Sequence, residues 1–149
     1  MSLKPLADNL FREADGGIRL VGGRCSGCDA VTFPLRSTCN QCDGGEVREE
    51  LLPRRGTVWT WTTQSFLPKA PYIGNETDAD FPGYVVGYVD LPGACLVETR
   101  IDVPAGQAGE LAPIGTEVES VAIEFPVQPD GEVFHTYAFR PVDAAGANR

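Results

Sequence analysis

Residues 21–42 read VGGRCSGCDAVTFPLRSTCNQC, and this stretch decides how the N-terminal part of the chain folds. It holds two Cys-x-x-Cys turns, made by Cys25 with Cys28 and by Cys39 with Cys42, separated by ten residues. Two such turns on adjacent hairpins supply the four sulfurs of a tetrahedral zinc site. Four thiolates leave no open coordination position, so we predict a structural zinc ion in a rubredoxin-like zinc ribbon.

Three other interpretations of this spacing are two disulfides, a redox motif and an iron site. Two disulfides suit a secreted protein, but the N-terminal sequence has no apolar run of signal-peptide length, since Asp8, Glu13 and Asp15 interrupt it. We therefore expect a cytoplasmic location, where thiols stay reduced. A redox Cys-x-x-Cys motif belongs to a βαβ context that the sequence lacks. An iron site remains open, because iron also accepts four thiolates.

The sequence after Gly56 has a β-strand pattern. Five segments alternate apolar or β-branched residues with polar ones, at 57–66, 84–90, 94–101, 116–125 and 133–140. A five-stranded Greek-key barrel of the OB type has this plan, with a longer connection after its third strand, whereas a β-sandwich usually needs about seven strands. We predict a mainly β chain with a C-terminal OB-fold barrel.

The N-terminal residues 4–14 (KPLADNLFREA) place Leu6, Leu10 and Phe11 at helical spacing, which predicts one short amphipathic helix. The predicted parts are an N-terminal helix in 1–16, a zinc ribbon in 17–52, the OB-fold in 53–142 and a disordered tail in 143–149.

The charge balance restricts the partners. The chain has 12 Lys and Arg residues against 21 Asp and Glu residues, a formal net charge of −9. Nucleic-acid binding depends on neutralising phosphates with cations, so we expect no nucleic-acid partner. No apolar stretch approaches the ~20 residues of a membrane span, so we expect no membrane partner.

The sequence offers no catalytic machinery: it has no Ser-His-Asp order, no P-loop and no glycine fingerprint for dinucleotides. Cys95 and His135 both lie in strand patterns beside apolar residues, and we interpret both as core residues, with the histidine hydrogen-bonded. We therefore predict no catalytic residue, and interpret the chain as a binding or assembly subunit that is not an enzyme by itself.

These motifs together resemble the zinc-ribbon/OB-fold family of acyl-CoA-associated proteins, long catalogued as a domain of unknown function. The resemblance rests on the cysteine stretch, on RRGTVWTWTTQSF at 54–66 and on YAFRPV at 137–142, and it covers about residues 3–142. Three positions depart from the family pattern: Asp29 replaces a glycine, and Leu35 and Asn40 replace prolines. None removes a predicted metal ligand.

The resemblance implies an accessory subunit of a thiolase-type acyl-CoA enzyme, such as a thiolase, a sterol-carrier-type thiolase or a thiolase-fold aldolase. In such assemblies, which include enzymes of lipid metabolism and steroid degradation, the partner holds the catalytic residues. The accessory subunit stabilises the partner and helps to frame the acyl-CoA site. An enoyl-CoA hydratase-like protein is a further implied partner.

Two groups of residues are candidates for contact with a CoA thioester. The cations are Arg36, Arg54 and Arg55, unless they pair with nearby glutamates such as Glu46, Glu49 and Glu50. The aromatic candidates for an apolar channel are Trp59, Trp61, Phe66 and Phe81, unless they belong to the core or to a partner interface.

Two other functions are alternatives. An independent acyl-CoA-binding protein would bind CoA thioesters without any partner. A single-stranded nucleic-acid-binding OB protein would combine stacking aromatic residues with a basic groove, which the negative charge disfavours.

Overall fold

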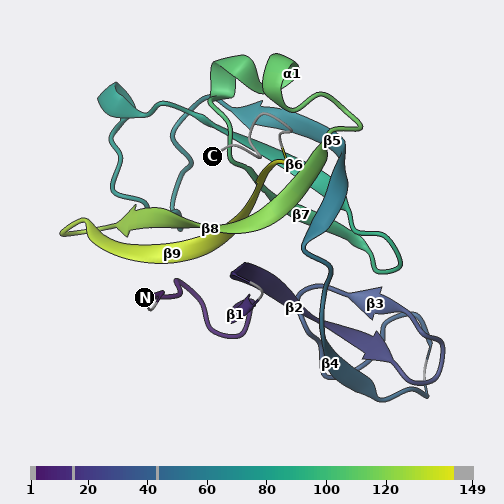
Figure 1. Cartoon of the computed structure of the whole chain (residues 1–149). Helices are drawn as coiled ribbons and strands as arrows, with labels where there is room; N and C mark the ends of the chain where they lie inside the picture. Colours follow the sequence, from purple (N-terminus) through teal and green to yellow (C-terminus); the bar gives the residue numbers. More distant parts are fainter. Residues whose placement is uncertain (1–2, 15, 43, 143–149) are drawn as a thin grey trace.

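The computed structural model describes residues 3–14, 16–42 and 44–142, and these form a small ribbon beneath a barrel (Figure 1). The ribbon part contains β1 (Phe11–Ala14), β2 (Gly17–Cys25), β3 (Val31–Thr32) and β4 (Val47–Leu51). The barrel part contains β5 (Arg55–Gln64), η1 (Asp78–Asp80), β6 (Tyr84–Asp90), β7 (Leu96–Ile101), η2 (Ala105–Gln107), α1 (Ala108–Leu111), β8 (Glu117–Val127) and β9 (Glu132–Pro141).

The barrel is closed, with the strand order β5-β6-β7-β9-β8 and β8 pairing back to β5. All neighbours are antiparallel except β7 and β9, which meet in parallel at Ile101 and Phe139. This is the Greek-key order of an OB-fold, and α1 fills the connection between its third and fourth strands. The prediction of a mainly β chain with a five-stranded OB barrel is confirmed.

The predicted helix at residues 4–14 is wrong. Phe11–Ala14 is instead strand β1, antiparallel to β2, and Pro5 forms a parallel bridge to His135 of β9. Asn9 has a φ of 64°, which no α-helix accommodates. The physical reason for the error is that the edges of β2 and β9 offer backbone partners, whereas an isolated helix of this length is only marginally stable.

His135 fixes the N-terminal segment to the barrel. Its N–H donates to the Lys4 carbonyl over 2.6 Å, its carbonyl accepts from the Leu6 N–H at 2.7 Å, and its Nδ1 accepts from the Lys4 N–H at 2.9 Å. The imidazole is therefore hydrogen-bonded, as predicted, but it is only half-buried and lies outside the core cluster, so the prediction of a core residue is wrong.

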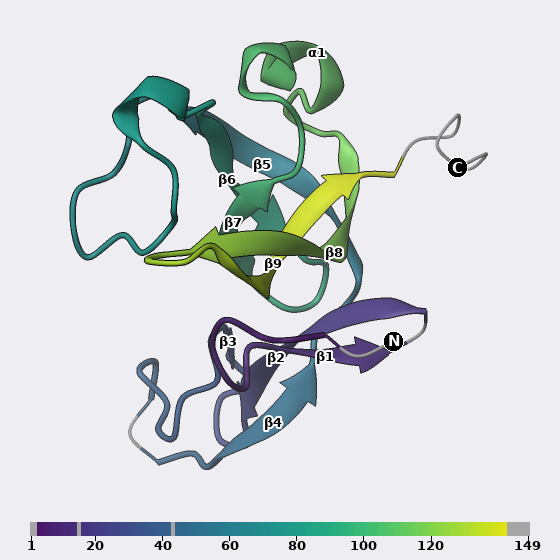
Figure 2. The same cartoon turned by 90° about the vertical axis from the view of Figure 1, so that its left-hand side faces the viewer.

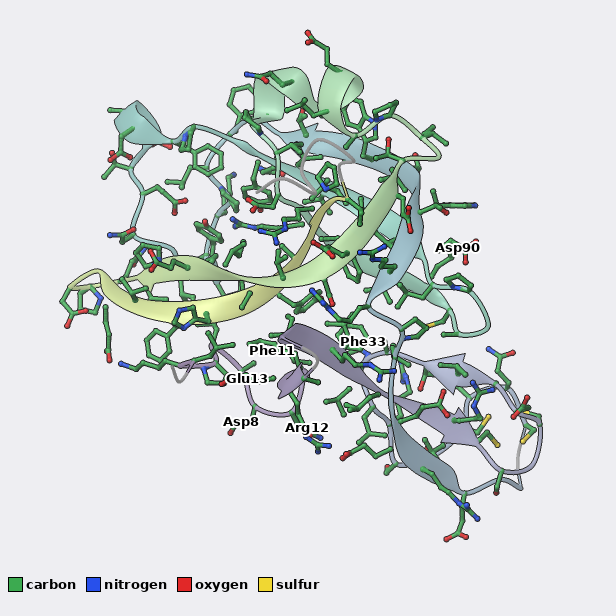
Figure 3. The ribbon with its side chains drawn as sticks, in the orientation of Figure 1. Asp8, Phe11, Arg12, Glu13, Phe33 and Asp90 are labelled. Carbon is green, nitrogen blue, oxygen red and sulfur yellow. The ribbon has the colours of Figure 1, made fainter. Side chains whose placement is uncertain are left out.

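The ribbon and the barrel share one hydrophobic core. Ile18, Leu20 and Leu52 from the ribbon side belong to the same cluster of buried side chains as Val85 and Phe139 in the barrel. The two labelled rings, Phe11 and Phe33, lie where the ribbon meets the barrel (Figure 3). The ribbon is therefore fixed against the barrel by burial of apolar surface as well as by the covalent connection.

Strand β5 contains a β-bulge between Val58 and Thr60. Val58 points into the core and is 1% exposed, whereas the next residue, Trp59, is 55% exposed. After the bulge the alternation restarts, and Trp61 packs against the core cluster. Regular alternation along 57–66 predicts that Trp59 and Trp61 share one face. The bulge changes which residues face inward, so that prediction is wrong.

The predicted disordered tail at 143–149 lies outside the described residues. Among the described residues, no helix has the length and apolar character that crossing a bilayer requires.

Candidate functional site

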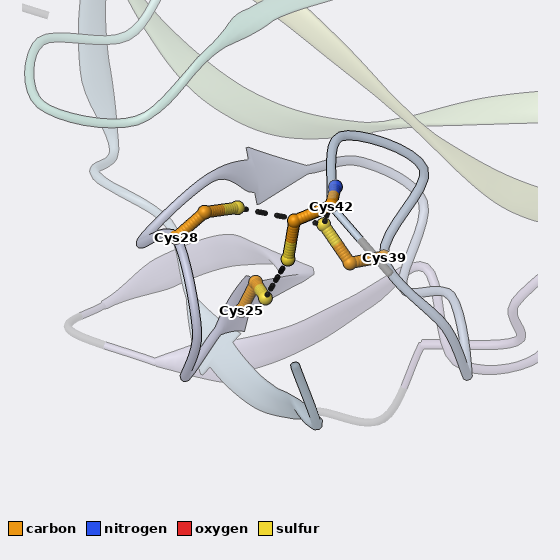
Figure 4. A group of neighbouring side chains, drawn as sticks. All are labelled: Cys25, Cys28, Cys39 and Cys42. Atoms are coloured by element: carbon orange, nitrogen blue, oxygen red, sulfur yellow. Dashed lines mark hydrogen bonds between the residues drawn. The ribbon is translucent and has the colours of Figure 1, made fainter. Parts of the chain in front are cut away.

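The four cysteines of the Cys-x-x-Cys turns come together at the far end of the ribbon (Figure 4). Cys25 ends strand β2 and Cys28 lies in the turn that follows, while Cys39 and Cys42 lie between β3 and β4. All four sulfur atoms lie within 4.8 Å of one another. The structure therefore brings together the four cysteines that the spacing predicts as metal ligands.

The distances between sulfurs fit one metal ion. Cys25 Sγ lies 3.6 Å from Cys42 Sγ, and Cys28 Sγ lies 3.6 Å from Cys39 Sγ. Sulfurs at ~2.3 Å from a tetrahedral zinc ion are separated by ~3.8 Å, whereas a disulfide requires ~2.05 Å. Each of these two sulfur pairs has one member from each turn, which is the arrangement expected when both turns bind the same ion.

Backbone groups support the sulfurs in the same way in both turns. The Gly27 N–H donates to Cys25 Sγ and the Gln41 N–H donates to Cys39 Sγ, each over 3.3 Å. These donors stabilise negative charge on the sulfurs, as a thiolate ligand requires. The donor set and its supports therefore fit a structural zinc ion.

The thiol groups alter each other's ionisation. The Ala30 N–H lowers the pKa of Cys28, but the hydrogen bond with Cys39 and burial outweigh it, so the pKa of Cys28 is raised to about 12. The Gly44 N–H and the thiols of Cys25 and Cys28 lower the pKa of Cys42. Metal binding requires all four groups to lose their protons, so it is favoured by rising pH.

Asp29 explains one departure from the family pattern. Its φ is 65°, in the left-handed region that glycine enters without steric cost, and its N–H closes the turn by donating to the Cys25 carbonyl over 2.9 Å. Aspartate tolerates this conformation better than most residues. Its carboxylate also lies 3.2 Å from the Arg24 guanidinium.

Two predicted arginines pair with acids on β8. Arg55 lies 3.9 Å from Glu117 and 3.8 Å from Glu119, and Arg54 lies 3.8 Å from Glu119. Arg36, by contrast, is exposed in the loop between β3 and β4. The structure therefore brings Arg54 and Arg55 together, but with carboxylates between them.

Two of the glutamates proposed as alternative partners of these arginines, Glu49 and Glu50, bind other cations. Glu50 accepts two hydrogen bonds of 2.8 Å from Arg24, and Arg12 pairs with Glu49. These side-chain hydrogen bonds lower the pKa of Glu50 and of Glu49.

The four aromatic candidates do not line one channel. Trp59 is exposed and meets Tyr88 edge-to-face at 6.2 Å between ring centroids, and Trp61 packs on the core. Phe66 is 82% exposed in the loop after β5. Phe81 lies edge-to-face on Tyr84 at 5.9 Å.

A second cluster, which the sequence did not reveal, surrounds Arg100. The Arg100 guanidinium lies 3.7 Å above the Tyr84 ring and 5.1 Å from the Phe125 ring. It also donates to the Tyr72 hydroxyl over 3.4 Å, and that hydroxyl donates to Glu76 over 2.9 Å. Burial raises the pKa of Tyr72. These residues come from four separate segments, so no local spacing in the sequence signals the cluster.

Two hollows meet at Arg100 on the outer surface of β6 and β7. One, of about 370 Å³, lies between the ribbon loop at Phe33 and the barrel at Tyr137. The other, of about 770 Å³, lies between Tyr84 and the segment 102–106. OB-folds usually bind ligands on this face of their second and third strands.

Two family models match the ribbon and the barrel as far as residue 123. The model of the ChsH2 rubredoxin-like zinc ribbon domain matches residues 18–48, and the model of the ChsH2 C-terminal OB-fold domain matches residues 49–123. Together with the four-cysteine geometry, the first match supports structural zinc over iron.

Two curated proteins are similar over most of the chain. The benzoylsuccinyl-CoA thiolase subunit BbsA of Thauera aromatica is 30% identical over 136 residues, covering 91% of this chain and 85% of that protein. A DUF35 domain-containing scaffold protein of Methanocaldococcus jannaschii is 29% identical over 127 residues, covering 83% of this chain and 82% of its own length.

A solved structure has the same fold. The structure of an Ltp2-ChsH2(DUF35) aldolase matches with a TM-score of 0.55 and 24% identity, covering 84% of this chain and 86% of the matched one.

Proposed function

The chain belongs to the ChsH2 family of zinc-ribbon/OB-fold proteins, and from that membership we propose that it is a non-catalytic accessory subunit of a thiolase-type acyl-CoA enzyme. The observation that carries the proposal is its 30% identity, over 91% of its length, to a protein named as a thiolase subunit. A second relative is named as a scaffold protein, which supports the same kind of role.

The architecture supports a subunit with a structural role rather than a catalytic one. A zinc ion held by four thiolates has no open position for substrate, so its contribution is to fold the ribbon. The shared core then fixes that ribbon against the barrel. We propose that this rigid pair of modules stabilises the partner enzyme and helps to frame its acyl-CoA site in the cytoplasm.

Three exposed apolar side chains of the barrel are candidates for contact with a partner. Trp59, Phe66 and Ile114 are 55%, 82% and 69% exposed. Aromatic residues are enriched where protein partners bind most strongly. An enoyl-CoA hydratase-like protein and a role in steroid or other lipid degradation remain finer proposals that rest on the family resemblance.

An independent acyl-CoA-binding protein is the second candidate, and the hollows beside Arg100 favour it. A nucleic-acid-binding OB protein is disfavoured by the net charge of −9, since counterion release requires clustered cations.

Reconstitution with a thiolase-fold enzyme of the host tests the proposal. We expect the enzyme to gain thermal stability and acyl-transfer activity when the zinc-loaded chain is added, and the chain alone to have no such activity. The Cys39→Ser/Cys42→Ser double variant is the control, because it removes one turn of the metal site. If none of the host's thiolase-fold enzymes gains stability or activity, the accessory role is refuted. Binding of acyl-CoA by the isolated chain would then favour the second candidate.

A further inference from the structure

The outer face of the barrel carries one cation in a position where it faces two hollows. Strands β6 and β7 alternate, so that Val85, Val97 and Ile101 point into the core while Tyr84 and Arg100 point outward. Arg100 lines both hollows and is the single Lys, Arg or His side chain among the residues that line either of them.

The guanidinium is held in place without being neutralised. Its flat face lies on the Tyr84 ring, the Phe125 ring borders it, and one N–H reaches the Tyr72 hydroxyl. Among the described residues, no carboxylate lies within 4.0 Å of it. The acid that its hydrogen bonds lead to is Glu76, which accepts from the Tyr72 hydroxyl and does not contact Arg100 itself. Aromatic rings hold a cation while leaving its remaining N–H donors able to bind an anion.

We propose that Arg100 and its aromatic neighbours form a binding site for the carboxylate of a small organic acid with an apolar body. The guanidinium matches a carboxylate in geometry, since two parallel N–H groups meet two oxygens. This site would extend the proposed function, because it gives the barrel a class of ligand. It rests on that function in one respect, namely that the chain meets acyl compounds.

The shape of the smaller hollow indicates what carries the carboxylate. From Arg100 the hollow runs along Val86 to the edge-to-face pair of Phe33 and Tyr137, whose ring centroids are 5.3 Å apart. The Tyr137 hydroxyl donates to the Glu98 carbonyl over 3.1 Å, which holds that ring in place. A hydrocarbon or aromatic group fits against these apolar side chains at the junction of ribbon and barrel.

The surrounding charges indicate a single negative charge on the ligand. Glu98 lines the smaller hollow, and Asp102 and Glu124 line the larger one. A polyanion, such as the nucleotide end of CoA, would meet these three acids with only one cation to offset them. A ligand group with one carboxylate needs only Arg100 to balance its charge. A free carboxylic acid meets this condition, and so does a thioester whose acyl group carries a carboxylate.

NMR titration of the zinc-loaded full chain tests the site. The probes are 4-phenylbutyrate and its uncharged amide, and the signals followed are the Arg100 Nε–H and the backbone N–H groups of Tyr84 and Val86. We expect the carboxylate to bind in the millimolar range and the amide about tenfold more weakly. We expect glutaryl-CoA, whose acyl group ends in a carboxylate, to shift the same signals and butyryl-CoA not to do so.

Variants test whether binding depends on the positive charge of Arg100 rather than on the fold. Arg100→Gln should weaken 4-phenylbutyrate binding about tenfold, Arg100→Lys by less, and Arg48→Gln, which removes an exposed arginine of the ribbon, not at all. Zinc content should be unchanged in all three, and each should still unfold in one cooperative transition. Equal binding of acid and amide, equal shifts by both thioesters, or full binding by Arg100→Gln would overturn the proposal. So would the absence of binding to the unmodified chain. None of these results depends on a protein partner, so they leave the accessory role to its own test.

Discussion

At the scale of single residues, the two adjacent glycines beside the metal site, Gly44 and Gly45, have very different surroundings. A Cβ on Gly45 would overlap the sulfur of Cys25 and crowd the backbone of Gly27, whereas a Cβ on Gly44 would meet nothing within 4 Å. Only the absence of a side chain at Gly45 lets the chain pass so close to a metal ligand.

We expect Gly45→Ala to displace the Cys25 sulfur, lower the zinc affinity and cost about 1–3 kcal/mol of stability, as other overpacked sites do. Competition with a zinc chelator and thermal unfolding measure both effects. Gly44→Ala is the matched control and should resemble the unmodified chain. Equal behaviour of the two variants would show that Gly45 is not tightly packed against the cluster.

Asp29 allows a second comparison at this scale. Because its φ is 65°, Asp29→Val should cost about 1–2 kcal/mol, while Asp29→Gly should be stabilising or neutral. Both changes remove the exposed ion pair with Arg24, so the difference between them reports the backbone conformation. Chemical denaturation of both variants supplies the two free energies. A valine variant as stable as the glycine variant would contradict the left-handed turn.

At the scale of elements, the strands and the ribbon were predictable and the deviations from regularity were not. The five barrel strands follow from alternating side chains, and the cysteine spacing fixed the ribbon, because both signals are local. The helix predicted at 4–14 failed because Asn9 breaks the helical path and the strand edges at β2 and β9 supply partners. The sequence did not predict the Arg100 cluster, because its members come from four separate segments.

The β5 bulge is an element-scale feature with a direct test. Trp61 packs on the core, so Trp61→Ala should cost about 3 kcal/mol, whereas Trp59→Ala should cost less than about 1 kcal/mol because Trp59 is more than half exposed. Urea unfolding measures both free energies. If the two variants lose equal stability, the two indoles share one environment, as an unbulged strand would place them.

At the scale of the whole molecule, the ribbon and the barrel stabilise each other through strand β2. Figure 2 shows β2 running beneath the barrel, between the N-terminal segment and β4. The buried Ser120 of β8 donates from its hydroxyl to the Ile18 carbonyl over 2.7 Å. The Arg19 guanidinium donates to the Leu51 and Leu52 carbonyls at the exit from β4.

The Ser120 hydrogen bond allows the connection between the parts to be measured. Ser120→Ala should cost about 1–2 kcal/mol, because it leaves the Ile18 carbonyl without this buried donor. Thr116→Ala, which removes an exposed hydroxyl bonded to Pro113 within one loop of the barrel, should cost less. Hydrogen exchange should be faster across β2 in the first variant only. Unchanged exchange there would mean that Ser120 does not help to hold the parts together.

Metal removal should affect both parts. Without zinc the ribbon loses the binding energy that folds it, and Leu20 and Leu52 then leave the core that they share with the barrel. We expect treatment with a chelator to lower the unfolding temperature of the whole chain, and acidification to release zinc as the thiolates regain protons. A barrel that unfolds at the same temperature with and without zinc would show that the two parts are independent.

The proposed assembly joins this four-cysteine zinc ribbon and OB barrel, as an accessory subunit, to a thiolase-type enzyme. Native mass spectrometry of the tagged chain, purified from its host without chelators, tests it most directly. We expect an assembly in which each copy of the chain carries one zinc ion and is bound to a thiolase-fold subunit. A metal-free or iron-containing chain that occurs only on its own would contradict it.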